Sequence, residues 1–92
     1  MEGQARVAVL GAGSWGTALA IVLARKGVAT SLWGRDAAAL DAMRATRRNA
    51  RYLPDATLPD TLELTASLPD ALARATLVLI VTPSHAFAEV LR

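Results

Sequence analysis

Three glycines near the start of the chain stand at the spacing G-x-G-x-x-G: Gly11, Gly13 and Gly16. In a turn that joins a strand to a helix, the first glycine permits a sharp bend, the second lets a ligand approach the backbone, and the third lets the helix pack close to the strand. Unpaired amides at the start of such a helix, together with its dipole, attract phosphate oxygens. We therefore expect this turn to bind the diphosphate of a dinucleotide, chiefly through the amides of Ser14 and Trp15.

The segments around this motif have the order that phosphate binding requires. An apolar run at residues 7–10 predicts a buried strand before the turn, and apolar residues at helical spacing predict a helix over residues 14–26 after it. A second strand is predicted over residues 28–33. A tight turn without a ligand is the alternative, and we favour it less because all three elements fall in register with the motif.

The end of the second predicted strand is where the choice between NAD and NADP is usually made, since an acidic residue there accepts hydrogen bonds from the ribose of NAD. Here Gly34 leaves space and Arg35 follows, and a guanidinium can pair with the 2′-phosphate of NADP. Asp36 is better interpreted as the N-cap of a short helix that carries Leu40 and Met43. We predict that NADP is preferred and NAD tolerated, with a solvated surface position as the alternative for Arg35.

Strands and helices alternate along the remaining chain. Beyond an irregular segment that contains Pro54 and Pro59, a short strand is predicted over residues 62–65 and another over residues 77–81. Ser67 or Asp70 starts a brief helix between them, which runs through residue 75. The alternation predicts an α/β fold, a Rossmann-like doubly wound parallel sheet. Four strands followed by one more helix suggest a truncated piece of a larger domain.

The pattern also predicts how the elements pack. Leu19, Val22 and Leu23 can share one face of the first helix, with Trp15 near its start, and Gly27 stands where a C-cap glycine belongs. The strand over residues 77–81 is apolar on both faces, so we expect it at the centre of the sheet. Thr82 and Pro83 then form the N-cap and first position of a last helix.

Composition excludes several classes of function. The formal net charge is +2, and nine of the ten basic residues are scattered arginines, which does not favour nucleic-acid binding. The chain has no cysteine, so we expect neither disulfides nor thiolate metal sites, and no metal site is predicted. No signal peptide is apparent, and the apolar run at residues 77–81 is too short to span a membrane. A cytoplasmic protein is expected.

Several motifs in order carry a resemblance to a known family. They are GAGSWGTALA at residues 11–20, LWGR at 32–35, NARYLP at 49–54 and VTPSHAF at 81–87. Together they closely resemble the N-terminal part of bacterial NAD(P)-dependent glycerol-3-phosphate dehydrogenase, over essentially all 92 residues. The resemblance implies an oxidoreductase that reduces dihydroxyacetone phosphate to sn-glycerol 3-phosphate with NADPH or NADH, for glycerophospholipid synthesis.

The resemblance further implies that Ser14, Trp15 and Arg35 contact the cofactor. Tyr52 and Phe87 are weaker candidates, for its adenosine and nicotinamide sides respectively. From the residues alone, Phe87 follows a strand on the edge of the sheet where ligands bind, with core packing as an equal alternative. Tyr52 could instead cover the edge of the sheet. His85 is interpreted as a solvated residue at the start of a helix rather than as a general acid.

The resemblance implies catalytic lysines and a mostly helical substrate-binding domain further along a longer chain. The only lysine here, Lys26, lies at the far end of the first predicted helix, so no catalytic residue is predicted within residues 1–92. We interpret these residues as a partial N-terminal NAD(P)-binding domain that binds nucleotide but is inactive alone. A homodimer is compatible with this interpretation. The alternatives are a stand-alone NAD(P)-sensing module, another NADP-linked dehydrogenase acting on a 3-hydroxy acid, and a purely structural domain.

Overall fold

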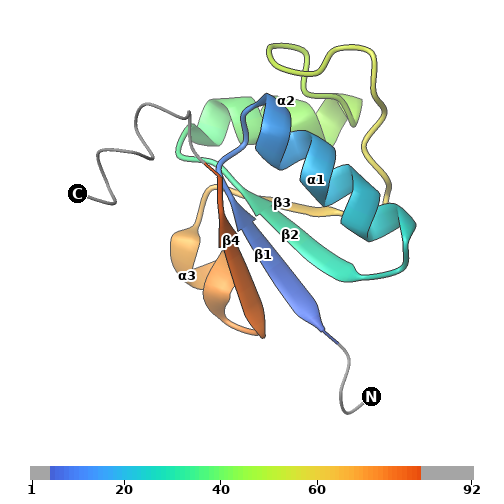
Figure 1. Cartoon of the computed structure of the whole chain (residues 1–92). Coiled ribbons are helices and arrows are strands. Elements are labelled where there is room, and N and C mark those ends of the chain that lie inside the picture. Colours follow the sequence, from blue (N-terminus) through green and yellow to red (C-terminus); the bar gives the residue numbers. More distant parts are fainter. Residues whose placement is uncertain (1–4, 82–92) are drawn as a thin grey trace, which may run out of the picture.

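The structure, a computed structural model, describes residues 5–81 and shows four parallel strands in the order β3-β2-β1-β4 (Figure 1). The strands and helices, in chain order, are β1 (Arg6–Leu10), α1 (Ser14–Arg25), β2 (Ala29–Trp33), α2 (Ala37–Thr46), β3 (Glu63–Thr65), α3 (Leu68–Leu72) and β4 (Leu77–Ile80). The predicted α/β doubly wound sheet is confirmed.

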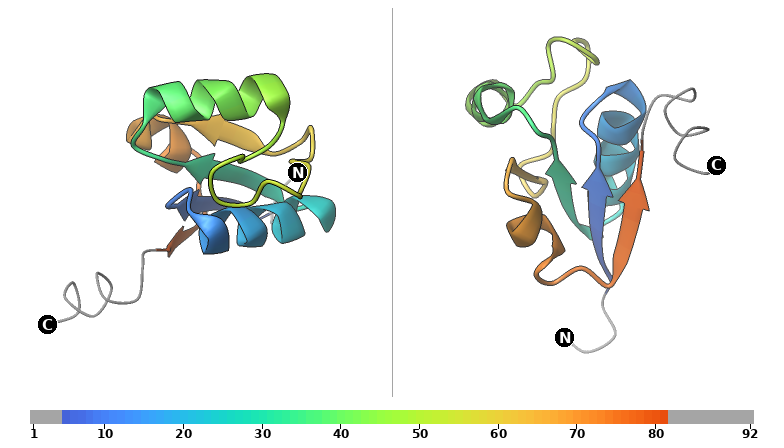
Figure 2. Two further views of the ribbon diagram at one scale, coloured as in Figure 1. Left: turned by 90° about the horizontal axis from the view of Figure 1, so that it is seen from above. Right: turned by 90° about the vertical axis from the view of Figure 1, so that its left-hand side faces the viewer.

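The connections between strands cross the sheet in two opposite directions, and this places helices on both of its faces. The connection through α1 steps from β1 to its neighbour β2, whereas the connection through α3 returns from β3 across the sheet to β4. Because parallel crossovers are right-handed, opposite steps place their helices on opposite faces. Figure 2, in its right-hand view, shows the sheet face-on with α3 in front of it and α1 behind it.

The core lies around β1 and β2. Val9 and Leu32 are fully buried in these strands, and Leu40 of α2 packs with them. The prediction that residues 77–81 form the central strand is wrong for the described part of the chain, since β4 is bonded to β1 alone and forms an edge. Ile80, in this strand, is 63% exposed. A strand that is apolar on both faces is buried only where other elements cover both faces of the sheet at that strand.

The predicted packing face of α1 is wrong in part, since Leu23 does pack against the core but Val22 and Trp15 do not. Val22 is exposed and Trp15 is 81% exposed, while the buried positions of the helix are Gly16, Thr17, Ala20, Ile21 and Ala24. The third glycine explains this, because a Cβ added at Gly16 would lie 1.8 Å from the carbonyl oxygen of Gly11. Because α1 is held this close to the glycine turn at Gly16, the small residues that follow at four-residue spacing, Ala20 and Ala24, also face the sheet.

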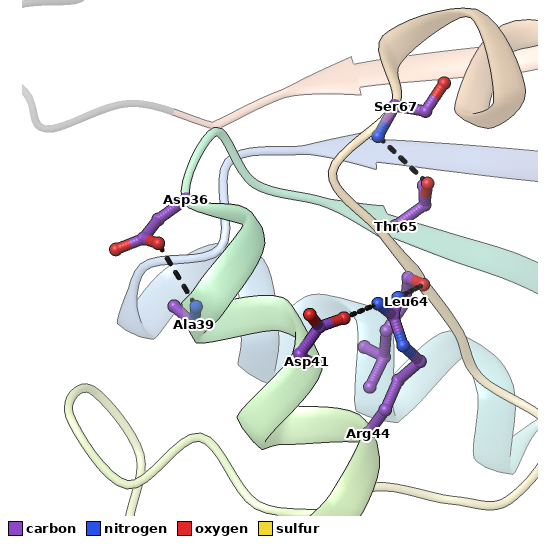
Figure 3. Close-up of polar contacts among 7 residues, drawn as sticks. All are labelled: Asp36, Ala39, Asp41, Arg44, Leu64, Thr65 and Ser67. Carbon is purple, nitrogen blue, oxygen red and sulfur yellow. Dashed lines mark hydrogen bonds and ion pairs between the residues drawn. The ribbon is translucent and has the colours of Figure 1, made fainter.

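Helix ends follow local signals. Asp36 Oδ1 accepts a hydrogen bond from the Ala39 amide at 3.2 Å, which confirms Asp36 as the N-cap of α2 (Figure 3). Of the two candidates for starting α3, Ser67 is the N-cap, and the helix ends at Leu72, three residues earlier than predicted. Gly27 follows α1 with φ +84°, a left-handed conformation that suits glycine.

The segment between α2 and β3 is irregular, as predicted, yet it is fastened to the core. Arg47 has a left-handed φ of 54° at the end of α2, and its guanidinium donates to the carbonyls of Pro59 and Leu62. Leu58 and Leu62 are almost completely buried. None of the helices between residues 5 and 81 combines the length and the hydrophobicity needed to cross a bilayer.

Candidate functional site

The glycine turn lies at the carboxyl ends of the strands, between β1 and α1. Gly11 adopts φ +125°, and a Cβ there would lie 2.0 Å from the carbonyl oxygen of Val81. Its amide donates to the carbonyl of Trp33 at 2.9 Å, which continues the pairing of β1 with β2. Gly11 and Gly16 are therefore required by the fold itself, because any side chain at either position would enter neighbouring backbone.

Gly13 differs from the other two glycines. Its φ of −80° and ψ of −166° form an extended conformation that any residue adopts, and a Cβ built on it would meet no atom within 4 Å. The fold gives no reason for a glycine here. Open space in front of the backbone is what a ligand that approaches the chain closely requires.

The amides that start α1 have no protein partners in the part of the chain that the structure describes. The first hydrogen bond of the helix runs from the Thr17 amide to the Gly13 carbonyl at 3.0 Å. Within residues 5–81, the amides of Gly13, Ser14, Trp15 and Gly16 donate to no protein acceptor. Gly13, the N-cap, has no side chain to cap them, and no acidic residue lies in the first turn. A phosphate group would supply the missing acceptors and interact favourably with the helix dipole.

A second segment, the loop that follows α2, is hydrogen-bonded across the glycine turn. Asn49 is 4% exposed, and its amide nitrogen donates to the Ala12 carbonyl at 2.9 Å and to Thr17 Oγ1 at 2.8 Å. The Ser14 hydroxyl donates to the carbonyl of Tyr52 at 2.9 Å. The side chain of Ser14 thus holds the loop, while its backbone amide donates to no acceptor in residues 5–81. Sequence reasoning singled out residues 49–54 only as a motif and assigned no role to Asn49.

Tyr52 lies beside the glycine turn through these contacts. Its amide donates to Asn49 Oδ1 at 3.4 Å, and the residue as a whole is 44% exposed. The guanidinium carbon of Arg51 lies 5.2 Å from the centre of the ring, within the range of a cation–π interaction. Tyr52 therefore offers a partly exposed aromatic surface at the edge of the candidate site.

Arg35 lies at the end of β2, where the sequence predicted it. Its side chain is exposed, and within residues 5–81 it forms no ion pair. The interpretation of Gly34 as open space is wrong, because a Cβ there would lie 2.8 Å from Leu40 Cδ2 and 3.0 Å from Ala12 Cβ. The absence of a side chain at Gly34 lets α2 and the glycine turn pack against the end of β2.

The site's surroundings limit what chemistry the described residues can do. Lys26 follows α1 at its C-terminal end, away from the glycine turn, as predicted. Phe87 and His85 lie outside the described residues. Between residues 5 and 81, no three His, Cys, Asp or Glu side chains gather as metal ligands would. Two surface hollows, of about 260 and 310 Å³, lie around Arg6 and Glu63, away from the glycine turn.

Comparison with known proteins identifies close relatives. Residues 6–92 match the family described as NAD-dependent glycerol-3-phosphate dehydrogenase N-terminus. A glycerol-3-phosphate dehydrogenase [NAD(P)+] of Xanthomonas euvesicatoria is 60% identical over 87 residues, which cover 95% of this chain and 26% of that protein. One from Stenotrophomonas maltophilia is 56% identical over the same length. The chain thus spans about a quarter of the length of these curated relatives.

Solved structures agree in fold. The crystal structure of glycerol-3-phosphate dehydrogenase from Coxiella burnetii superposes with a TM-score of 0.83 at 49% identity, over 95% of this chain and 27% of that one. The enzyme from Saccharomyces cerevisiae superposes with a TM-score of 0.79 at 26% identity, over 95% of this chain and 28% of that one. The fold described above is therefore one that these proteins share.

Proposed function

Because the chain belongs to the family of NAD-dependent glycerol-3-phosphate dehydrogenase N-termini, we propose that it is the cofactor-binding part of an oxidoreductase. The resemblance seen in the sequence is thereby confirmed. The proposed reaction is the reduction of dihydroxyacetone phosphate to sn-glycerol 3-phosphate with NADPH or NADH, for glycerophospholipid synthesis. The relatives' names support this reaction over a stand-alone sensor module and over a 3-hydroxy acid dehydrogenase.

One observation carries the cofactor proposal: the glycine turn is open at Gly13 and presents amides without protein acceptors in the described part of the chain. A Cβ at Gly13 would occupy the space that a diphosphate needs. The amides of Ser14 and Trp15 would then donate to its oxygens, and the positive end of the α1 dipole would stabilise their charge. The residues present fit the group.

The remaining candidates would contact other parts of the dinucleotide. Arg35, exposed at the end of β2, would pair with the 2′-phosphate of NADP and so favour it over NAD. Asp36 already caps α2, so its carboxylate is occupied on one side by the Ala39 amide. Tyr52 would contact the adenosine, and Phe87 remains a candidate for the nicotinamide side. We propose that NADP is preferred and that NAD is tolerated.

When bound, the reduced nicotinamide supplies the hydride for the carbonyl of the substrate. The described residues bind and orient the cofactor: the glycine turn fixes the diphosphate, and its position at the carboxyl ends of the strands directs the dinucleotide along that edge. None of residues 5–81 at this edge is a lysine or histidine that could polarise a carbonyl. We therefore propose that the 92 residues alone bind dinucleotide without turnover. A cytoplasmic location and a homodimer remain predictions.

Calorimetric titration with NADPH and with NADH tests the proposal. We expect both to bind, NADPH the more tightly, because a charge-assisted contact to the 2′-phosphate stabilises its complex by about 1.5–3 kcal/mol. Equal affinities, or tighter binding of NADH, would remove the role of Arg35 in cofactor choice. If neither NADPH nor NADH binds, the proposed function is refuted.

A further inference from the structure

We propose that Asn49 is a positioning residue for the diphosphate: it sets the orientation of the peptide group that joins Ala12 to Gly13. The inference rests on the proposed cofactor function and assigns a role to a side chain that need not touch the cofactor. Asn49 lies 37 residues beyond Ala12 in the chain, in the loop that follows α2. Its amide is buried between that loop and the turn.

The contacts of Asn49 use the donors of a neutral amide. The amide nitrogen carries two hydrogens, and its two acceptors are the Ala12 carbonyl and Thr17 Oγ1. The amide oxygen accepts from the Tyr52 backbone at longer range. Because the Ala12 carbonyl can only accept, the nitrogen of Asn49 must face it. An aspartate of the same shape would have no hydrogen to donate and would bring its charge toward a carbonyl oxygen.

The orientation of this peptide group matters for the ligand. In a trans peptide the carbonyl and the following amide point in opposite directions. Holding the Ala12 carbonyl on the side of Asn49 turns the Gly13 amide away from the loop, to the opposite side of the turn. It also keeps a carbonyl oxygen, the negative end of the peptide dipole, from facing a phosphate. Thr17, fully buried, links the same clamp to the first turn of α1.

The test compares two probes in the same protein. NADPH contains the diphosphate, whereas 2′-AMP contains the adenosine and the 2′-phosphate without it. In Asn49→Asp we expect the dissociation constant of NADPH to rise by about tenfold or more, while that of 2′-AMP changes by less than about twofold. A merely structural role would lower the melting temperature and weaken both probes together, which would overturn the inference.

A second set of variants decides the question even if Asn49→Asp fails to fold. Thr17→Val removes one acceptor of the Asn49 amide, and we expect NADPH to weaken about threefold relative to 2′-AMP. Thr17→Ser keeps the hydroxyl and should restore the ratio. Thr30→Val is the matched control, because Thr30 is a buried threonine of β2 whose hydroxyl donates to the carbonyl of Val28, just before that strand and away from the turn.

The outcomes separate this inference from the proposed function. If the unaltered protein binds no NADPH, the cofactor proposal fails and the role of Asn49 with it. If the unaltered protein binds NADPH and the ratio of the two dissociation constants stays constant in Asn49→Asp and Thr17→Val, only the role of Asn49 is refuted. A ratio that also shifts in Thr30→Val would show a general effect of destabilisation and would refute it equally.

Discussion

Replacing Gly13 by alanine should abolish most dinucleotide binding while leaving the fold intact. The extended backbone at Gly13 is open to any residue, and the added Cβ would meet no protein atom within 4 Å. The methyl group would instead project into the space in front of the turn. The substitution therefore tests what occupies that space.

The effect on stability is the difference of two small terms. Gly→Ala reduces the conformational entropy of the unfolded chain, which stabilises a protein by about 0.4–1 kcal/mol where the backbone is compatible. Gly13 is also the N-cap of α1, where alanine is less favourable than glycine by roughly 0.5–1 kcal/mol. Since the terms oppose each other, we expect the free energy of unfolding to change by less than about 0.5 kcal/mol.

The effect on binding should be much larger. A methyl group between the diphosphate and the backbone would lengthen or break at least one charge-assisted hydrogen bond from an amide of the turn. Such a bond contributes about 1.5–3 kcal/mol, so the dissociation constant of NADPH should rise by about 10- to 100-fold.

Urea denaturation measures the free energy of unfolding, and calorimetric titration measures the dissociation constant of NADPH. Gly16→Ala serves as the contrast, because its Cβ would lie 1.8 Å from the Gly11 carbonyl oxygen, and we expect a loss of about 3 kcal/mol or more in stability. A stable Gly13→Ala protein that binds NADPH with undiminished affinity would refute the reasoning. The diphosphate would then lie elsewhere.

Three further substitutions test other parts of the structure. Arg35→Gln should weaken NADPH by about 10- to 100-fold in titrations and leave NADH within about twofold, and equal losses for both would contradict the 2′-phosphate contact. Asp36→Ala should lower the free energy of unfolding by about 1 kcal/mol in urea denaturation, because the hydrogen bond that caps the Ala39 amide is lost. The affinity for NADH should not change, and a selective loss of NADH binding would make Asp36 a ribose ligand instead. Leu32→Ala, at a fully buried position of β2, should lower the free energy of unfolding by about 2–5 kcal/mol, and a smaller loss would mean that the core collapses around the cavity.

Features decided by neighbouring residues could be predicted from the sequence. Asp36 caps an amide three residues later, and Gly11 and Gly16 meet within one turn, so the residues that set these contacts lie together in the chain. The motif therefore identified the glycine turn, and the alternation of apolar runs identified the parallel sheet. Glycine spacing could not reveal that packing requires Gly11 and Gly16 whereas Gly13 lies beside open space, because that difference depends on the atoms around each one.

The tertiary structure decided the features that depend on distant segments. The buried face of α1 follows from its close approach to the turn at Gly16, which leaves the larger apolar residue Val22 exposed. Asn49 reaches Ala12 only because the loop after α2 folds back across the turn. Sequence by itself determined the elements and the location of the glycine turn, since both are local; the contacts of Asn49 across that turn arise from residues brought together by folding.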